Sequence, residues 1–470
     1  MTQRSILRPA ITLCAAIALS VVAMAAVPGT PPQQPPPPPP GQDQAREGSG
    51  VVTSASGGKP KLAVPDFLAA TPDAESKAIA ATIGQVLWAD LDFEREFYMV
   101  PRDTYASIPV PASIDAVPFD RWRELGAEGV VIGAVRKTAT GVVVQVRLYN
   151  VANQTAAFSK EYSGTAANPR VFAHTIADEI HKQQRNLTGV ARTKLTFSSD
   201  RDGERMKGTV YSRGVKEIYI ADYDGANPRR ITVNRSLNIN PVWSSDGKAI
   251  AYTSYRRANF PDLYIQRIYE GTPPQSPAHG TDRIHNFLPA WSPDGTKLAF
   301  MTNRDGNAEI YVMDASGGNL RRITRHPGID STPTWSPAGN QIGFTSDRSG
   351  SPQIYIVDAD GLGQPQRITS NETWADRATW SPSPFNEIAY AARSGPGFDI
   401  KIYDVAERTS RTLTSGEGSN ESPAFSPTGR HLAFTSTRAG NEQIFVVGRD
   451  GNGLKQVTKE GRNFTPNWSR

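Results

Sequence analysis

A repeated phrase fills the C-terminal half of this chain and constrains its fold more than any other feature of the sequence. The copy from Leu288 to Thr324 reads LPAWSPDGTKLAFMTNRDGNAEIYVMDASGGNLRRIT. Its apolar residues alternate with period two in four short segments, PAWS, KLAF, EIYVMD and RRIT, which is the pattern of β-strands. Ser292-Pro293-Asp294-Gly295 predicts a tight turn between the first two, because Pro presets one dihedral angle and Asp-Gly accepts a positive φ.

The copies of the phrase are evenly spaced. Each contains one aromatic residue before a serine, and the six anchors are Trp243, Trp291, Trp335, Trp380, Phe425 and Trp468. Their spacing of roughly 45 residues is that of a four-stranded propeller blade, and an open solenoid or array is the competing interpretation. We expect the six anchors to lie in the core, since a buried Trp removes on the order of 200 Å² from water.

The two ends of the repeat region favour a closed ring. The first unit, Lys194 to Thr232, lacks a Trp-Ser strand, whereas Pro466 to Ser469 supply such a strand with no unit after it. Pairing of these two segments would complete a blade and remove the edges that an open array leaves exposed. The sequence therefore predicts a six-bladed β-propeller over residues 191–470, closed by its N- and C-terminal strands.

The first 25 residues have the features of a signal peptide. Arg4 and Arg8 precede an apolar run from Ala10 to Met24, and small residues before and at Ala25 suit signal peptidase. An uncleaved anchor is the alternative, although the run is shorter than the ~20 residues of a spanning helix. Cys14, the only cysteine, lies inside this run, so the exported chain would have neither a disulfide nor a cysteine-based metal site.

The next two regions differ in composition. Residues 26–60 contain the run Pro35 to Pro40 and then mostly Gly, Ser, Gln and Thr, which predicts a tether. Residues 61–190 alternate between the helical and the strand pattern, which predicts a compact α+β domain. The expected helices are 73–92, 119–125 and 169–184, and the expected strands are 61–67, 97–100, 129–136, 142–149 and 157–162.

Charge and histidine content exclude some functions. The net charge is +5, from 51 basic and 46 acidic residues, and no run of Lys or Arg predicts nucleic-acid binding. His174 and His181 lie two turns apart on an expected helix, too far for one metal ion without other ligands. We therefore expect no metal site and no cofactor.

The order of these regions resembles that of the TolB family, the periplasmic component of the Tol-Pal system. The resemblance covers Lys61 to Arg470. It is strongest in four stretches: KLAVPDF (61–67), FDRWRELGAEGVVIGAV (119–135), FAHTIADEI (172–180) and WSPDGTKLAF (291–300). It implies a monomeric periplasmic scaffold that supports outer-membrane integrity and cell division and contacts membranes only through its partners.

The resemblance also implies two partners. In the family the propeller face binds the peptidoglycan-associated lipoprotein Pal, and the N-terminal region communicates with TolA of the inner membrane. Here the proline tether and GSGVVTSASGG (48–58) replace the β-prone segment with which family members begin. Residues just before each Pro-x-Trp-Ser strand should line the propeller mouth, and the expected Pal contacts are His285, Asn286, Leu288, Ser331, Thr332, Arg377 and Glu421. A loop-capping role is the alternative for His285.

An arginine recurs after the second strand of every unit. The six are Arg201, Arg256, Arg304, Arg348, Arg393 and Arg438. Together they could form a basic ring that attracts an acidic partner. Bonds to local carbonyl groups or to a neighbouring Asp would explain the recurrence equally well.

Two enzymatic interpretations remain as alternatives to a binding protein. Prolyl-oligopeptidase-like peptidases have similar blades, but they need a G-x-S-x-G nucleophile elbow, which this sequence lacks. A lyase or glycosidase would need convergent His, Asp or Glu in the channel, whereas the blades carry Asp mainly in turns. We expect no enzyme; a propeller adaptor for another envelope complex is a further alternative.

Overall fold

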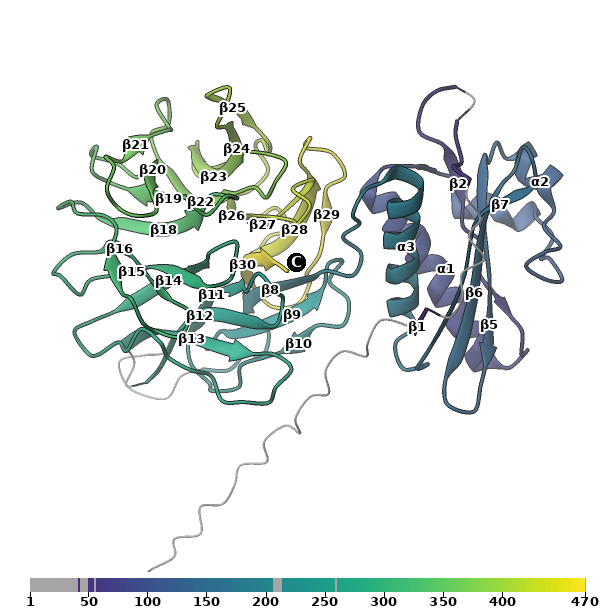
Figure 1. Cartoon of the computed structure of the whole chain (residues 1–470), viewed down its shortest axis with the longest axis horizontal. Coiled ribbons are helices and arrows are strands. Elements are labelled where there is room, and N and C mark those ends of the chain that lie inside the picture. Colours follow the sequence, from purple (N-terminus) through teal and green to yellow (C-terminus); the bar gives the residue numbers. More distant parts are fainter. Residues whose placement is uncertain (1–40, 43–49, 55, 206–213, 258–259, 470) are drawn as a thin grey trace, which may run out of the picture. The chain divides into compact units, whose positions relative to one another are not determined.

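The computed structural model describes residues 41–42, 50–54, 56–205, 214–257 and 260–469. They form an α+β domain followed by a six-bladed β-propeller, as predicted (Figure 1). The predicted signal peptide, Cys14 and most of the predicted tether lie outside the described residues. Among the helices that are described, none has both the length and the apolar composition needed to cross a membrane.

The N-terminal domain is one mixed sheet covered by helices. Its strands are β1 (Gly41–Gln42), β2 (Lys61–Ala63), β3 (Leu68–Ala69), β4 (Tyr98–Met99), β5 (Gly129–Lys137), β6 (Val142–Asn150) and β7 (Thr155–Gly164). The sheet order is β1-β7-β6-β5-β2-β4, and β3 pairs with β5. The helices are α1 (Ala74–Glu94), the 3-10 helix η1 (Arg102–Ser107), α2 (Phe119–Glu124) and α3 (Arg170–Arg185).

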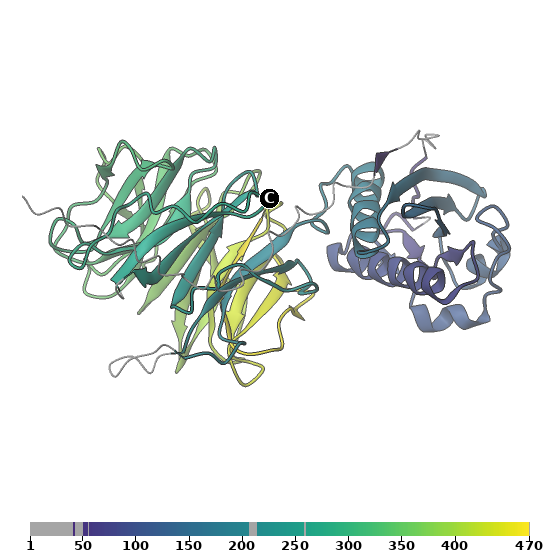
Figure 2. The ribbon, with the colours of Figure 1, turned by 90° about the horizontal axis from the view of Figure 1, so that it is seen from below.

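Helices α1 and α3 lie side by side against one face of this sheet (Figure 2). Ile83 and Leu87 of α1 and Ile176 of α3 are fully buried in the same apolar core as Val144 of β6. Asp73 begins α1, because its carboxylate accepts a hydrogen bond from the Ser76 N–H at 2.9 Å. The alternating apolar residues of the strands and the helical spacing on α1 thus build one core.

The folded part of the chain begins before residue 61. Composition predicts instead that these residues belong to the tether, which would end at residue 60. The side chain of Val52 is 1 % exposed and belongs to the core of the N-terminal domain. Its backbone N–H donates to the Gln184 side chain on α3 at 2.8 Å. Composition did not predict this contact, because two adjacent valines among Gly, Ser and Thr leave no periodic pattern.

The propeller consists of six antiparallel sheets. The first blade is β10 (Arg229–Arg230), β9 (Glu217–Asp222), β8 (Lys194–Ser199) and β30 (Asn463–Trp468); the second is β11 (Asn238–Trp243), β12 (Ala249–Arg257) and β13 (Phe260–Arg267); the third is β14 (Asn286–Trp291), β15 (Lys297–Thr302), β16 (Glu309–Asp314) and β17 (Arg321–Arg322). The fourth is β18 (Asp330–Trp335), β19 (Gln341–Ser346), β20 (Gln353–Asp358) and β21 (Gln366–Arg367); the fifth is β22 (Ala375–Trp380), β23 (Glu387–Ser394), β24 (Gly397–Asp404) and β25 (Thr409–Thr412); the sixth is β26 (Asn420–Phe425), β27 (His431–Ser436), β28 (Gln443–Gly448) and β29 (Lys455–Gln456).

The ring is closed by the last strand of the chain. β30 pairs antiparallel with β8, with Trp468 opposite Leu195 and Asn463 opposite Ser199. The Trp468 Nε1–H donates to the Thr193 hydroxyl at 2.6 Å, and the side chain is 6 % exposed. The predicted pairing of the two ends, and with it the six-bladed ring, is confirmed.

The aromatic anchors line the ring as repeated core residues, with one exception. Trp243, Trp335, Trp380, Phe425 and Trp468 are between 6 % and 8 % exposed. Trp291 is only partly buried, contrary to the expectation that all six are core. It borders a surface depression that also contains Gln275, because the outer edge of the second blade is a single bridge between Ile265 and Gln275.

Polar contacts join the N-terminal domain to the propeller. The Asp90 carboxylate of α1 accepts hydrogen bonds from His174 Nδ1 of α3 and from the Tyr223 hydroxyl of the first blade, both at 2.8 Å. Glu94 of α1 pairs with Arg430 of the sixth blade at 2.7 Å, and its carboxylate side chain is 2 % exposed. A charge is tolerated inside a protein where it has a partner of opposite charge. The pairing of these buried groups therefore determines which residues of the two domains are in contact.

Candidate functional site

One strand of each blade lines the central channel, and these six inner strands share one design. They are β11, β14, β18, β22, β26 and β30. Each begins with a fully buried residue, namely Asn238, Asn286, Asp330, Ala375, Asn420 and Asn463. Each then forms a β-bulge, where the register against the second strand shifts by one residue.

The third residue of every inner strand has a left-handed backbone. These residues are Asn240, Leu288, Thr332, Arg377, Ser422 and Thr465, with φ between 47° and 57°. Such a conformation is uncommon outside glycine and is strained for a β-branched residue. Hydrogen bonds between blades hold it: the Leu288 N–H donates to the Thr253 hydroxyl at 3.1 Å, and the Thr465 N–H to the Thr435 hydroxyl at 3.0 Å.

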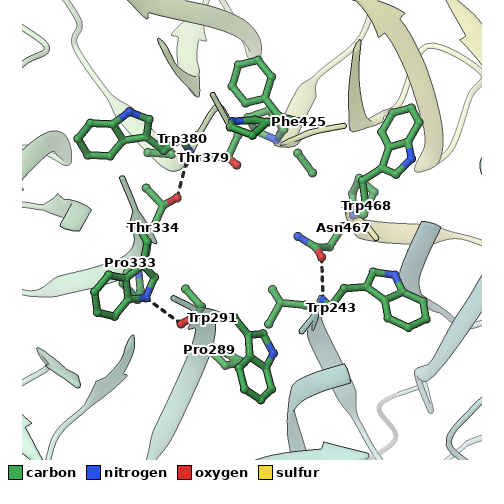
Figure 3. Close-up of a pocket in the computed structure, with 18 of the residues that line it drawn as sticks. Trp243, Pro289, Trp291, Pro333, Thr334, Thr379, Trp380, Phe425, Asn467 and Trp468 are labelled. Carbon is green, nitrogen blue, oxygen red and sulfur yellow. Dashed lines mark hydrogen bonds between the residues drawn. The ribbon is translucent and has the colours of Figure 1, made fainter. Parts of the chain in front are cut away.

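The six inner strands enclose a channel with a cavity of about 280 Å³ (Figure 3). Hydrogen bonds also join neighbouring strands here, from the Trp243 N–H to Asn467 at 2.8 Å and from the Trp380 N–H to Thr334 at 3.0 Å. Arg377 is the one ionisable residue among the described residues that line the channel. The described wall therefore presents no carboxylate or imidazole to the cavity.

His285 is fixed at the mouth, one residue before β14. Its backbone N–H donates to the Asn303 side chain at 2.7 Å, and its ring packs edge-on against Phe287 with centroids 6.2 Å apart. Its Nε2 lies 3.2 Å from the Asp282 carbonyl oxygen, a contact that the loop-capping alternative requires. The imidazole is only partly buried and remains accessible from solvent.

The neighbouring expected contact, Asn286, is not accessible. Its side chain is 0 % exposed, and its Nδ2 donates to the Asp262 carboxylate of the second blade at 2.8 Å. The first residue of an inner strand points into the joint between two blades, so the side chain of Asn286 is buried where a partner contact was expected. Leu288, Ser331, Thr332, Arg377 and Glu421, by contrast, are all partly exposed at the inner strands.

Three of the recurring arginines make the same bonds. The Nε–H groups of Arg201, Arg348 and Arg438 donate to a serine two residues earlier, at 3.1, 2.8 and 3.1 Å. Their Nη2 groups contact the first residue of their own blade's inner strand, which is Asn463, Asp330 and Asn420 respectively. These bonds account for the recurrence of arginine without a partner.

The other three arginines lie over aromatic rings of their own blades. Arg256, Arg304 and Arg393 stand 5.2, 5.5 and 5.0 Å from the ring centroids of Tyr264, Tyr311 and Phe398. Such stacking is worth about 0.5 to 1 kcal/mol at exposed sites. All six guanidinium groups of the expected basic ring thus have intramolecular contacts.

Two exposed apolar residues at the mouth were not among the sequence candidates. Ile329 and Trp374 are 54 % and 39 % exposed and directly precede β18 and β22, in the position that His285 occupies before β14. The alignment of the six units could have identified them by this shared position. The expected contacts of the fourth and fifth blades instead began two and three residues later, at Ser331 and Arg377.

The histidines of α3 are core residues. His174 and His181 are 4 % and 0 % exposed, and His181 Nδ1 lies 2.9 Å from the Ala177 carbonyl oxygen. Across the part of the chain that the structure describes, no cluster of three or more His, Cys, Asp or Glu side chains could hold a metal ion.

Two family models match the chain. A model of the TolB amino-terminal domain matches residues 51–157, and a model of the TolB beta propeller domain matches residues 185–470. Together they include both domains described above.

Individual relatives agree with the family models. The chain is 36 % identical over 270 residues to the Tol-Pal system protein TolB of Desulfosudis oleivorans, an alignment that covers 57 % of this chain and 58 % of that protein. It is 34 % identical over 392 residues to that of Bordetella avium, covering 83 % and 82 %. The crystal structure of TolB from Acinetobacter baumannii matches with a TM-score of 0.72 at 26 % identity and covers 91 % of this chain and 98 % of that chain.

Proposed function

Because the chain belongs to the TolB family of Tol-Pal system proteins, we propose that it is a non-enzymatic periplasmic scaffold whose propeller mouth binds a Pal-like lipoprotein. The observation that carries the proposal is His285, which the Asn303 bond and the Phe287 ring hold at the mouth with its imidazole accessible. A side chain fixed before binding loses little conformational entropy when a partner covers it.

The N-terminal domain would link the propeller to a TolA-like protein of the inner membrane. Through both contacts the scaffold would support outer-membrane integrity and constriction at cell division. The support for this part is membership of the family and the buried ion pairs, such as Glu94 with Arg430, that join the two domains. The protein would act as a monomer and reach membranes only through its partners.

The chemistry of the channel supports a binding role over a lyase or glycosidase. Glycoside cleavage uses two carboxyl groups that face the substrate, and metal-assisted elimination uses convergent metal ligands. The described channel wall offers Arg377 as its one ionisable residue, with aromatic, proline and hydroxyl side chains around it.

The proposal is tested by calorimetric titration of residues 26–470 with the periplasmic domain of Pal from the same organism. We expect binding by the wild type and at least tenfold weaker binding by His285→Ala, with His279→Ala, an exposed histidine of the same loop, as the matched control. No binding by folded wild type at micromolar concentrations would contradict the proposal and leave an adaptor for another envelope complex.

A further inference from the structure

Six equivalent residues form the rim of the propeller mouth, each directly before an inner strand. They are Leu237, His285, Ile329, Trp374, Ser419 and Arg462. The carbonyl oxygen of each accepts a hydrogen bond, at 3.0 to 3.4 Å, from a backbone N–H near the C-terminal end of the second strand of its own blade or directly after that strand. Their side chains are therefore presented from a fixed backbone.

Four of the six rim residues are fixed through their backbone N–H groups as well. The Ile329 N–H donates to the Asp347 carboxylate and the His285 N–H to the Asn303 amide oxygen, both at 2.7 Å. The same bond recurs at Ser419 and Arg462. A rim residue can contact a partner without first ordering its loop.

The rim differs in character from one side to the other. Leu237, Ile329 and Trp374, with His285 among them, occupy four successive blades and form what we term the apolar arc. The remaining two positions are the polar Ser419 and Arg462. Trp374 and Ile329 are among the large apolar side chains that the described residues leave exposed. Exposed Trp at a fixed backbone is the residue type most often found to dominate binding energy in protein interfaces.

Charge follows the same division. Exposed Arg257, Arg283, Arg325 and Arg393 lie in the loops of the apolar arc, and within the described residues none of them has a carboxylate within 4 Å. These loops also carry the exposed Asp282 and the partly buried Asp347, which is bonded to Ile329. Two further carboxylates of these loops, Asp305 and Glu372, are paired with Arg322 and Lys401. On the other side the loops carry Glu417, Glu442 and Glu460 together with the exposed cations Lys459 and Arg462, so the excess of positive charge lies on the side of the arc. A partner is thus attracted to the arc if it is acidic.

We propose that the partner of this propeller docks off-centre on the apolar arc, presenting an apolar side chain to Trp374 and Ile329 with acidic residues on either side. The inference rests on the proposed function and deepens it, because it assigns the contact to the second to fifth blades and states the chemistry of the partner. His285 lies within the same surface.

The test compares exposed apolar residues in titrations with the Pal periplasmic domain. We expect Trp374→Ala to weaken binding at least tenfold and Ile329→Ala several-fold, whereas Leu362→Ala, 87 % exposed in the turn between β20 and β21, leaves the affinity unchanged. The melting temperature of each variant shows that it is folded at the temperature of the titration, so that a loss of affinity is assigned to the lost contact.

A charge test complements it. Arg325→Glu combined with Arg393→Glu should weaken binding and flatten its salt dependence, whereas Glu417→Gln should not weaken it. If wild type binds Pal and Trp374→Ala binds equally well, docking on the apolar arc is contradicted while the proposed function stands. If folded wild type does not bind Pal, both are overturned.

Discussion

At the scale of single residues, the joints between blades are built from buried polar side chains. The Thr232 hydroxyl bonds the Glu217 carboxylate, which in turn accepts from Asn238 Nδ2 of the next blade at 2.9 Å. Thr458, Gln443 and Asn463 repeat this arrangement where the ring closes. A buried polar group of this kind is stable only when it has its hydrogen-bond partner. Substitution of one partner therefore lowers the free energy of unfolding.

The joint at Asp330 differs because it contains a carboxyl group where four other blades have Asn. Burial raises the pKa of Asp330, while the bond from Ser346 and the charge of Arg348 oppose that rise. Arg348 Nη2 contacts both carboxylate oxygens, at 3.0 and 2.8 Å, and the Asp330 side chain is 0 % exposed. The pair therefore depends on both of its members.

We predict that Arg348→Ala lowers the free energy of unfolding by about 3 to 5 kcal/mol, because it leaves the Asp330 carboxylate buried without its partner. Arg393→Ala, the equivalent but exposed arginine of the fifth blade, should lower it by no more than about 1 kcal/mol, the contribution of its stacking on Phe398. Urea denaturation measures both. Adding Asp330→Asn to Arg348→Ala should restore part of the loss; a double variant as unstable as the single one would contradict this account.

Residue type alone could not separate binding residues from joint residues at the mouth. His285 and Asn286 are adjacent polar residues, yet one side chain reaches solvent and the other bonds Asp262 inside the protein. Their directions are set by the strand that begins at Asn286, and the sequence pattern does not show where that strand begins.

At the scale of elements, the inner strands explain why the sequence predicted the blades well and the mouth less well. The apolar alternation is readable from the Pro of each PAWS-like segment onward. The strand β14 begins three residues earlier, at Asn286, and the left-handed residue Leu288 interrupts its alternation. A bulge shifts the period-two pattern by one residue. The apolar alternation therefore does not identify the first half of each inner strand as β-strand.

The closing strand β30 gives a prediction at this scale. Trp335→Ala should lower the free energy of unfolding by about 3 to 5 kcal/mol, the usual range for such core truncations. Substitution of either Trp335 or Trp468 also removes an indole Nε1–H bond, to the Ala290 carbonyl oxygen and to the Thr193 hydroxyl respectively. Trp468→Ala should cost at least as much, because its bond lies where the two ends of the chain close the ring. Trp468→Phe, which keeps most of the packing, should cost less than the alanine variant. A melting temperature of Trp468→Ala equal to that of wild type would contradict the role of this side chain in closure.

At the scale of the whole molecule, a buried histidine lies where the two domains meet. His174 of α3 faces Asp90 of α1 at 2.8 Å and Asp222 of the first blade at 3.8 Å, with Tyr223 edge-on to its ring. Lys194 and Arg170 also contact Asp222. Burial acts to lower the pKa of His174, but the two carboxylates outweigh it and raise the pKa to about 9.

This arrangement predicts how stability depends on pH. His174 binds its proton more tightly in the folded protein than in the unfolded chain, where its pKa is about 6.5. Its contribution is therefore complete below pH 6.5 and is lost as the pH rises through about 9. The melting temperature of wild type should fall across this window more steeply than that of His174→Asn. Parallel curves for the two proteins would show that the imidazolium does not stabilise the junction.

The measurement that tests the central claim most directly is hydrogen–deuterium exchange of residues 26–470 with and without the Pal periplasmic domain. If the propeller mouth is the binding surface, Pal should slow exchange in the loops that end at His285, Ile329 and Trp374. Exchange in the loops that end at Ser419 and Arg462 should change less. Protection confined to the N-terminal domain, with the mouth loops unchanged, would contradict the assignment of the mouth as the Pal site.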